Sequence, residues 1–278
     1  MPSLEMGDWH RLPECPVSLT GLASLLELPV KAAHQDMSDP IFSNSRLAAL
    51  YDTLEGERHD LAFYAGLVDK YAAQSVLDIG CGTGVFACHL ASRGINVVGL
   101  DPAEASLRIA RHKPGAGRVQ WVLGDAACMP PLKVDMATMT GNVAQVLLSD
   151  DDWSSALRAI GQALRPKGHL AFETRDPAKE AWRNWNREQT CRRIEVSGLG
   201  AVTTWCDVTK IDLPFVSFRW TYEFEAEGAV IVSNSTLRFR SQAECVRSLG
   251  HAGYVVKEIL DAPDRPGEEF VFVTRYSE

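Results

Sequence analysis

Several features that mark large classes of protein are missing from this sequence. Its 278 residues contain no run of 18 apolar residues, so we expect no membrane-spanning helix. The first residues lack the basic segment and long apolar core of a signal peptide. Basic residues are in the minority, with 28 Lys and Arg against 36 Asp and Glu, which gives a formal net charge of −8. This acidic balance argues against a broad phosphate-binding surface for nucleic acid.

Paired cysteine motifs are also missing. The seven cysteines are an odd number and include no C-x-x-C pair, which favours reduced thiols over a disulfide framework. No histidine–cysteine spacing typical of a zinc site occurs, so we expect no metal. We therefore expect a cytoplasmic protein. Its length and its 46% hydrophobic content suffice for one large α/β domain with an insertion.

The most informative stretch that is present joins a strand to a helix through glycines. Ser75–Ile79 has the pattern of a short buried strand, and Val85–Ser92 that of the start of a helix. Between them, Gly80, Gly82 and Gly84 occupy every second position. This order forms a cradle for a nucleotide-type ligand, because a backbone without Cβ atoms can turn sharply and approach the ligand closely. We expect the backbone of Cys81, between two of these glycines, to approach the ligand as well.

The spacing of the glycines distinguishes between ligands. A dinucleotide fingerprint, G-x-G-x-x-G, would require a third glycine at position 85, which is Val85. Asp78 stands two residues before the first glycine, where a carboxylate suits an ammonium group better than a pyrophosphate. A nicotinamide dehydrogenase is therefore disfavoured. A glycine-rich turn of some other α/β protein remains an alternative.

Further polar residues follow the later strands. Ile95–Leu100 ends at Asp101-Pro102, 17 residues past Gly84, where an acid can accept hydrogen bonds from a ribose diol. The third, fourth and fifth predicted strands are Arg118–Leu123, Val134–Met139 and His169–Glu173, followed by Asp125-Ala126, by Thr140-Gly141-Asn142 and by Arg175. Helices are predicted between these strands, for example over residues 151–164. Before the glycines, Asp60 is the predicted N-cap of another helix.

The pattern changes between residues 191 and 240, where strands follow one another without helices. This segment contains six basic and six acidic residues, so it is no basic platform for nucleic acid. Ser241–Glu244 then has the form of a capping box and begins the last helix, and Tyr254–Leu260 and Glu269–Thr274 supply two more strands. The predicted fold class is α/β, a Rossmann-like doubly wound seven-stranded sheet with an antiparallel β insertion between strand 5 and the last helix.

The D-x-G-x-G-x-G pattern of residues 78–84 resembles motif I of the class I S-adenosylmethionine-dependent methyltransferases. The Leu-Arg-Pro-Lys-Gly turn at 164–168 is typical of the same class, and the resemblance extends from about residue 45 to the C-terminus. It implies S-adenosyl-L-methionine as the cofactor, with Asp125 accepting from the adenine amino group. Arg58 offers a guanidinium whose fork geometry matches the cofactor carboxylate. The predicted cofactor-binding residues are Tyr51, Arg58, Asp78, Gly80, Cys81, Gly82, Gly84, Asp101, Pro102, Asp125, Ala126 and Thr140.

Within the class, the sequence most resembles small-molecule N-methyltransferases of the glycine N-methyltransferase kind. It shares with them a tyrosine helix at a similar distance before motif I, here at Leu50-Tyr51, as well as Gly141-Asn142 after the fourth strand and an arginine, Arg175, after the fifth. The resemblance implies that Asn142 and Arg175 hold a substrate carboxylate. Thr140 departs from that pattern, in which the residue is apolar, and so does the inserted sheet.

Two substrate assignments have structural alternatives. Arg175 could instead form a surface ion pair with Asp176 or Glu180. Trp182, a predicted substrate residue, lies three positions from Trp185 on an expected helix, and both could serve core or lid packing instead.

The predicted domains are a loosely packed extension at 1–36, an S-adenosylmethionine-binding Rossmann-like domain at 37–190, the insertion at 191–240 and the end of the Rossmann-like domain at 241–278. The insertion could be a substrate lid or a dimer surface.

The predicted activity is methyl transfer from S-adenosylmethionine to a nitrogen or oxygen of a small molecule. A neutral amine needs little beyond alignment, whereas a hydroxyl needs a general base, and no residue stands out as one. The alternatives are an RNA or protein methyltransferase and a non-catalytic S-adenosylmethionine-binding protein. The predicted partner is a small-molecule methyl acceptor, with no nucleic acid, no membrane and a possible homodimer.

Overall fold

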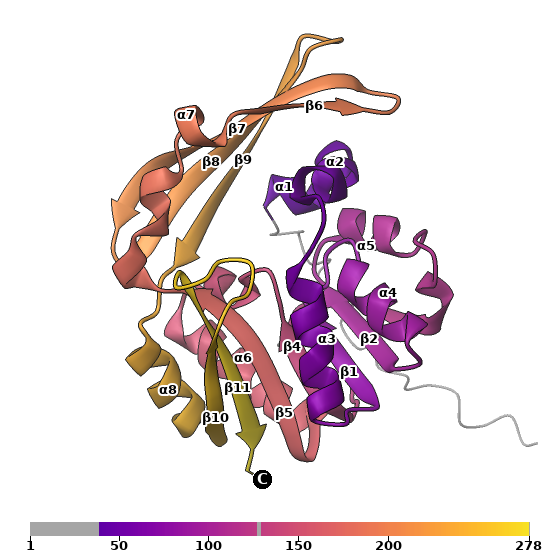
Figure 1. Cartoon of the computed structure of the whole chain (residues 1–278), viewed down its shortest axis with the longest axis vertical. Helices are drawn as coiled ribbons and strands as arrows, with labels where there is room; N and C mark the ends of the chain where they lie inside the picture. Colours follow the sequence, from indigo (N-terminus) through magenta and orange to yellow (C-terminus); the bar gives the residue numbers. More distant parts are fainter. Residues whose placement is uncertain (1–38, 127–128, 278) are drawn as a thin grey trace, which may run out of the picture. The chain divides into compact units, whose positions relative to one another are not determined.

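The computed structural model describes residues 39–126 and 129–277. The predicted extension at 1–36 lies outside the described residues. Seven strands form one sheet in the order β10-β11-β5-β4-β1-β2-β3 (Figure 1). Their bounds are β1 Ser75–Ile79, β2 Asn96–Asp101, β3 Val119–Leu123, β4 Val134–Met139, β5 Leu164–Arg175, β10 Tyr254–Asp261 and β11 Glu269–Tyr276. The five strands β1 to β5 are parallel, and β11 runs antiparallel between β5 and β10, which confirms the predicted seven-stranded sheet.

The strand order reverses direction at β1. The chain proceeds from β1 to β2 and β3 on one side, then crosses back to β4 and β5 on the other. β1 and β4 are paired, with Asp78 opposite Thr138, so their carboxyl ends lie side by side where the order reverses. Ligands of doubly wound sheets bind outside the carboxyl ends of the strands at such a switch point.

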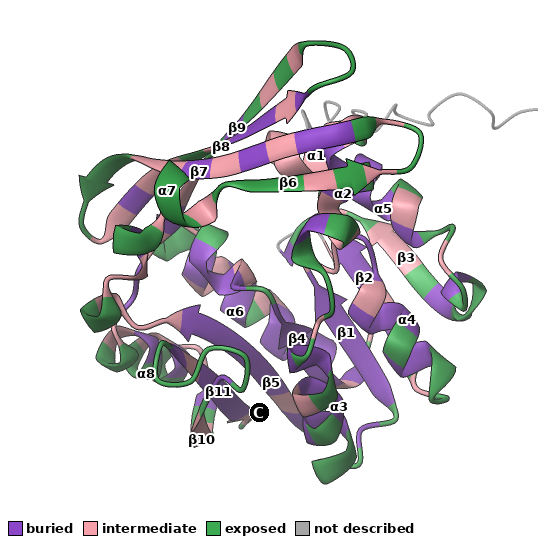
Figure 2. Cartoon of the chain, turned by 45° about the horizontal axis from the view of Figure 1, so that its top comes forward, coloured by how far each residue is buried: buried purple, intermediate pink, exposed green. Residues whose placement is uncertain are grey.

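Helices cover both faces of this sheet. α3 (Asp60–Lys70) and α4 (Val85–Ser92) pack over one face, and α6 (Asp150–Ala163) and α8 (Gln242–His251) over the other. The centre of the sheet between them is accordingly enclosed, and every residue of β1 is buried. In Figure 2, β1 and β5 carry the buried colour, whereas the solvent-facing sides of the helices are exposed.

Local sequence signals set the ends of several helices. α8 begins with the predicted capping box, in which Ser241 and Glu244 each accept from the backbone N–H of the other. Ser149 caps α6 by accepting from the Asp152 backbone N–H. The prediction for α3 is wrong, because its N-cap is His59, and the Asp60 carboxylate binds Arg58 instead of the helix backbone. The remaining helical elements are α5 Glu104–Ala110, α7 Arg187–Thr190, η1 Ala116–Arg118, η3 Val143–Val146, η4 Pro177–Lys179 and η5 Ala181–Asn184.

The predicted antiparallel insertion forms a separate four-stranded sheet. Its strands are β6 Arg192–Val196, β7 Gly200–Asp212, β8 Phe215–Phe224 and β9 Ala229–Arg238, paired in chain order. Alternate residues of β7 and β8, among them Val202 and Tyr222, pack against Leu47 and Leu50 of α2 (Ser45–Glu55). The short helix α1 (Pro40–Ser43) also contacts this sheet, because the Ile41 backbone N–H donates to Ser233 Oγ at 3.0 Å. Figure 1 shows α1 and α2 beneath this sheet.

Candidate active site

The predicted site residues come from separate segments that meet at one edge of the large sheet. Most of them follow the carboxyl ends of the parallel strands β1 to β5, and Tyr51 and Arg58 lie on α2 and in the segment before α3. Parallel pairing places these strand ends side by side. The topology therefore brings the predicted residues to a common edge, although it does not by itself test their roles.

The three glycines after β1 are required for different physical reasons. All three have positive φ, +66° at Gly80, +54° at Gly82 and +78° at Gly84. A Cβ at Gly80 would approach Val143 to 2.5 Å, and one at Gly84 would approach Trp121 to 2.5 Å. A Cβ at Gly82 would meet no atom within 4 Å. Gly80 and Gly84 are thus constrained by packing, whereas Gly82 faces open space that a ligand could occupy.

Backbone hydrogen bonds fix the glycine loop, residues 80–84, onto β2. The Leu100 carbonyl accepts from the backbone N–H groups of Gly80 and Cys81 at 2.8 and 3.1 Å. The buried Asp101 carboxylate accepts from Gly82 N–H through Oδ2 and from Ala103 N–H through Oδ1, both at 2.8 Å. Asp101 therefore orients the loop. Its contact with a ribose stays a prediction.

Asp78 is a buried acid just below the glycine loop. The residue is 1% exposed, and its Oδ1 accepts from the Thr138 hydroxyl at 3.0 Å. Burial, with a smaller contribution from nearby Asp101, raises the pKa of Asp78 to about 7 against the opposing effects of Thr138 and Arg58. A positively charged ligand group beside this carboxyl would stabilise its ionised form. The predicted contact of Asp78 with an ammonium group stays a prediction.

The helix α2 is tied directly to the glycine loop. The Thr83 hydroxyl donates to Asp52 Oδ1 at 2.5 Å, and the Lys113 ammonium binds the other oxygen of Asp52. Tyr51 is the adjacent residue of α2, and burial raises its pKa. Nothing in the sequence pattern distinguishes Asp52, so its role was not predicted.

Arg58 is engaged in an ion pair within its own segment. Its Nε and Nη2 donate to the two oxygens of the buried Asp60 at 2.7 and 2.5 Å. This bidentate pair occupies one edge of the guanidinium. A contact with the cofactor carboxylate, as the sequence suggested, would have to use the Nη1 side.

A second group of polar side chains lies beyond the ends of β4 and β5, and all of them are buried except the half-buried Arg175. We call Tyr64, Asn142, Glu173, Arg175 and Glu269 the buried polar cluster. Glu173 Oε1 accepts from the backbone N–H groups of Gly141 and Asn142 at 2.6 and 3.1 Å, and the Tyr64 hydroxyl donates to Oε2. Burial raises the pKa of Glu173, and the charge of Glu269 adds to the effect. Glu173 thereby fixes the loop in which Asn142 adopts a φ of +63°.

Arg175 is also enclosed in this cluster. Its Nε lies 3.5 Å from Glu269 Oε1, and its Nη1 donates to Gln145 Oε1 at 3.1 Å. Its guanidinium carbon lies 5.6 Å from the centre of a ring of Trp185. Burial lowers the pKa of Arg175, which Glu269 opposes.

The alternative of a surface ion pair for Arg175 is wrong. Asp176 caps η4 by accepting from the Ala178 backbone N–H, and Glu180 pairs with Arg183 at 2.5 Å. Both carboxylates therefore have other partners, and the partner of Arg175 comes from β11. No sequence pattern around Glu269 predicted its contact with Arg175.

Trp182 lies in the 3-10 turn η5 rather than on the expected helix, and Trp185 follows the end of that turn. Trp182 is 4% exposed and packs edge-on against Phe239, with ring centroids 4.6 Å apart. These contacts favour the packing alternative. Its role as a substrate residue stays a prediction.

The remaining predicted residues lie along the same sheet edge. Thr140 and Ala126 are buried, whereas Pro102 and Asp125 are exposed after β2 and β3. Their cofactor contacts stay predictions. Within residues 39–126 and 129–277, no group of three or more His, Cys, Asp and Glu side chains is arranged to hold a metal ion.

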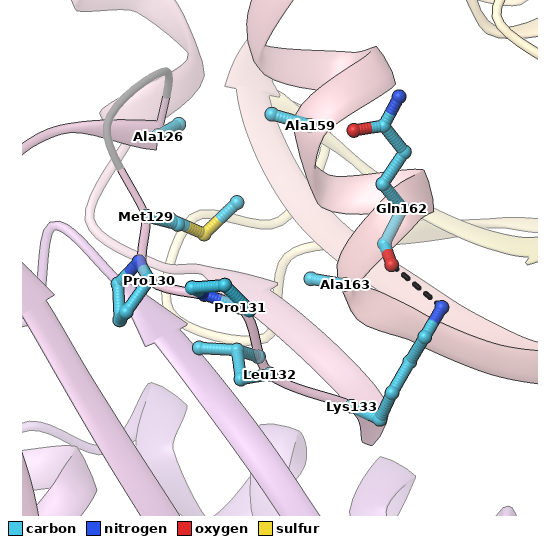
Figure 3. A pocket seen from close by; sticks show the side chains of 9 residues that line it. All are labelled: Ala126, Met129, Pro130, Pro131, Leu132, Lys133, Ala159, Gln162 and Ala163. Carbon is cyan, nitrogen blue, oxygen red and sulfur yellow. Dashed lines mark hydrogen bonds between the residues drawn. The ribbon is translucent and has the colours of Figure 1, made fainter.

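A cavity of about 580 Å³ lies between the segment leading into β4 and α6 (Figure 3). It is lined by Ala126, Met129, Pro130, Pro131, Leu132, Lys133, Ala159, Gln162 and Ala163. The Lys133 ammonium donates to the Gln162 carbonyl at 2.7 Å across one end. Of its lining residues only Ala126 belongs to the predicted site, so this cavity is separate from the space beside Gly82.

Comparison with known proteins agrees with this geometry. Residues 76–168 match a family model described as a methyltransferase domain. The ubiquinone biosynthesis O-methyltransferase of Idiomarina loihiensis is 32% identical over 127 residues, which cover 44% of this chain and 51% of that protein. The cypemycin N-terminal methyltransferase of a Streptomyces species is 31% identical over 150 residues, 51% of this chain and 60% of that protein.

Solved structures share the fold over a larger part of the chain. The CcbJ methyltransferase from Streptomyces caelestis has a TM-score of 0.72 and 23% identity, covering 87% of this chain and 100% of its own. The amino pentose methyltransferase of calicheamicin biosynthesis from Micromonospora echinaspora, solved with S-adenosylmethionine bound, has a TM-score of 0.61 and 22% identity, with 81% and 94% covered.

The family match shows a methyltransferase domain in this chain, and the solved structures show that the chain has the fold of S-adenosylmethionine-dependent methyltransferases. More particularly, the chain carries a methyltransferase domain whose matched part, residues 76–168, includes the glycine loop and Asp101. The predictions of class, fold and cofactor are confirmed. The chain spans about half the length of the curated relatives that it matches. Among the described residues, no helix is long and apolar enough to cross a membrane.

Proposed function

We propose that this protein transfers the methyl group of S-adenosylmethionine to a nitrogen or oxygen atom of a small molecule. The observation that carries the proposal is the glycine loop, which Asp101 and Leu100 hold in place while Gly82 borders open space. The similar proteins named above include an O-methyltransferase of ubiquinone biosynthesis and an amino pentose methyltransferase. Their names support a small-molecule acceptor for this chain.

The residues around the loop would bind and orient the cofactor. S-adenosylmethionine supplies an activated methyl group, so the protein has mainly to align it with the acceptor. In this proposal Asp78 faces the ammonium group, Asp101 the ribose and Asp125 the adenine amino group. Correct alignment of two reactants can lower a barrier by ~7–11 kcal/mol.

The four-stranded sheet would act as a cover on the acceptor side. Its inner face packs on α2, and α2 is bonded to the glycine loop through Asp52 and Thr83. A cover linked to the loop in this way can exclude water from the reacting atoms. We therefore favour a lid over a dimer surface, and a homodimer is left as a secondary proposal. The predicted domain boundaries at 36, 190 and 240 stay proposals.

Location and partners are proposals of the same kind. The described cysteines, Cys81, Cys88, Cys191, Cys206 and Cys245, are free thiols, which supports a cytoplasmic location. The acidic net charge of −8 supports a small molecule over a nucleic acid as the acceptor.

Calorimetry tests the cofactor part of the proposal. S-adenosylmethionine and S-adenosylhomocysteine should bind, whereas NAD should not. Gly82→Val should abolish binding, because its side chain would fill the space beside the loop. Gly94→Val is the matched control, since Gly94 also has a positive φ, +88°, and open space around it, but lies between α4 and β2. Binding of NAD in place of the sulfonium compound would refute the proposal.

Methyl uptake tests the catalytic part. Labelled S-adenosylmethionine would be incubated with protein and a fractionated extract of small molecules, RNA and protein. Label should enter the small-molecule fraction with the wild type and not with Gly82→Val. Label in RNA or protein would favour the alternative acceptors. Cofactor binding without any uptake would favour a non-catalytic binding protein.

A further inference from the structure

Two buried oxygen atoms of the polar cluster have no hydrogen-bond partner among the described residues. They are Asn142 Oδ1 and Glu269 Oε2. Asn142 is 3% exposed and Glu269 2% exposed. A buried acceptor that receives no hydrogen bond costs about 1–3 kcal/mol, and more if it is charged. Proteins keep few such atoms, and each one in a native structure calls for an explanation.

The partners of Glu269 are all gathered on its other oxygen. Glu269 Oε1 accepts from Asn142 Nδ2 at 3.1 Å and from Arg265 Nη1 at 2.8 Å, and Arg175 Nε lies 3.5 Å from it. The Asn142 amide is therefore oriented with its nitrogen toward Glu269, which leaves Oδ1 on its other side. Asn142 Oδ1 is bonded to the same carbon as Nδ2, and Glu269 Oε2 is bonded to the same carbon as Oε1. They are thus two unpartnered acceptors on side chains that one hydrogen bond joins.

The same contacts argue against a carboxylate ligand. Arg175 was predicted to hold a substrate carboxylate together with Asn142. In the structure, its Nε faces Glu269 and its Nη1 donates to Gln145. The cation thus already has a buried counterion, and the two unpartnered atoms beside it are acceptors. A ligand that completes this cluster must bring hydrogen-bond donors.

The loop that contains Asn142 also packs against the glycine loop. Val143, the residue after Asn142, is the side chain that a Cβ at Gly80 would approach to 2.5 Å. Glu269 begins β11 and pairs in register with Arg175 at the end of β5. Glu269 is therefore beside the end of β5, after which the chain passes to the four-stranded sheet.

We propose that Asn142 Oδ1 and Glu269 Oε2 together bind the amino group of the methyl acceptor, which makes a small amine the substrate class. This inference rests on the proposed methyltransferase function. An amino group can donate one N–H to each oxygen and keep its lone pair for the methyl carbon, whereas a hydroxyl has a single O–H. Transfer forms the C–N bond as the C–S bond breaks, the sulfur keeps that electron pair, and the positive charge passes from sulfur to nitrogen. The Glu269 carboxylate stabilises the positive charge that forms on this nitrogen.

Three probes with the same ring test the proposal: cyclohexylamine, cyclohexanol and cyclohexanecarboxylate. Their binding to protein saturated with S-adenosylhomocysteine would be measured by saturation-transfer NMR titration. The amine should bind the wild type at least about tenfold more tightly than the other two, the range for a hydrogen bond to a charged group.

Two variants identify the responsible atoms. Glu269→Gln keeps the size of the side chain, and Asn142→Gly tolerates the positive φ of that position. Each should weaken binding of the amine about tenfold. Glu268→Gln, which changes the exposed neighbouring residue, should bind it like the wild type. Thermal unfolding and the affinity for S-adenosylhomocysteine report on whether each variant is folded.

Every outcome bears on one of the two proposals. Equal binding of amine and carboxylate to the wild type would overturn the inference, and so would an unchanged affinity of Glu269→Gln for the amine. Loss of S-adenosylhomocysteine binding by a folded Glu269→Gln would place this residue at the cofactor and overturn it as well. Failure of the wild type to bind S-adenosylhomocysteine would instead refute the proposed function.

Discussion

The glycine loop and the buried polar cluster lie at the same edge of the sheet, but they differ in how far apart in sequence their contacting residues are. The loop is built within residues 78–101, mostly from backbone groups, with Asp101 as its main side-chain support. The cluster joins residues far apart in sequence: Tyr64 and Glu173 are 109 positions apart, and Asn142 and Glu269 are 127. Its contacts are made largely by charged and polar side chains.

This difference separates two kinds of constraint. Backbone contacts to a cofactor depend on glycine spacing, so they persist through many changes of side chain and produce a readable motif. A cluster of buried side chains specifies which groups a ligand must offer, and it can change when one partner changes. We therefore expect the loop to define the cofactor and the cluster to define the acceptor. Substitutions can test this division.

The largest effect is expected for Glu173→Ala. It leaves the Tyr64 hydroxyl and the backbone N–H groups of Gly141 and Asn142 without their acceptor. At about 1–3 kcal/mol for each of these three buried unpaired groups, the free energy of unfolding should fall by at least about 3 kcal/mol. Urea unfolding measures it. Glu173→Gln keeps an oxygen for the two N–H groups and should lose far less. A similar loss in both variants would mean that charge rather than hydrogen bonding matters.

The sequence allowed most of the fold to be predicted because strands and helices depend on local patterns. The seven strands, the antiparallel insertion and the capping box at Ser241 follow from alternation, glycine and proline positions and a four-residue motif. The glycine loop could be predicted for the same reason, because its pattern is local. The contact between Arg175 and Glu269 was not, because it depends on the register of β5 against β11. Nor did the sequence indicate that Arg58 would bind Asp60 and remove the expected N-cap of α3.

The second prediction concerns Asp101→Ala. This change should weaken binding of S-adenosylmethionine by ~1.5–3 kcal/mol, the range for hydrogen bonds to a charged group. Calorimetry with the natural cofactor and with an analogue lacking both ribose hydroxyls separates two causes. If Asp101 binds the ribose, the variant should lose more affinity for the natural cofactor than for the analogue. An equal loss would mean that Asp101 acts only by holding Gly82 and the loop.

The third prediction uses the pH dependence of stability. Burial raises the pKa of Asp78 to about 7 from 3.8, so between these values the folded protein binds a proton that the unfolded chain does not. The ligand-free wild type should therefore lose stability as pH rises, by up to about 1.4 kcal/mol per unit between pH 5 and 6. Asp78→Asn keeps the oxygen that accepts from Thr138 and removes the titration. Relative to this variant, the wild type should become less stable as pH rises.

Matched measurements make the Asp78 prediction specific. Asp151→Asn removes an exposed acid at the start of α6 and should follow the wild type across the same pH range. Asp78→Asn should also bind S-adenosylmethionine less tightly, because it cannot offer a charge to the ammonium group. Parallel stability curves for Asp78→Asn and the wild type would contradict the raised pKa. Unchanged cofactor affinity would remove Asp78 from the cofactor site.

The smallest effect is expected at α2, the helix that links the glycine loop to the four-stranded sheet. Thr83→Val keeps the shape of the side chain but removes its hydrogen bond to Asp52, at a cost of about 0.5–1.5 kcal/mol. Hydrogen exchange should then speed up for the backbone amides of α2, while those of α4 stay protected. Ser92→Ala, which removes an exposed hydroxyl bonded within α4, should leave α2 unchanged. If Thr83→Val also leaves it unchanged, the packing of Leu47 and Leu50 against the four-stranded sheet holds α2 in place. In that case α2 belongs with the sheet and the acceptor side, and Tyr51 would be expected to contact the acceptor rather than the cofactor.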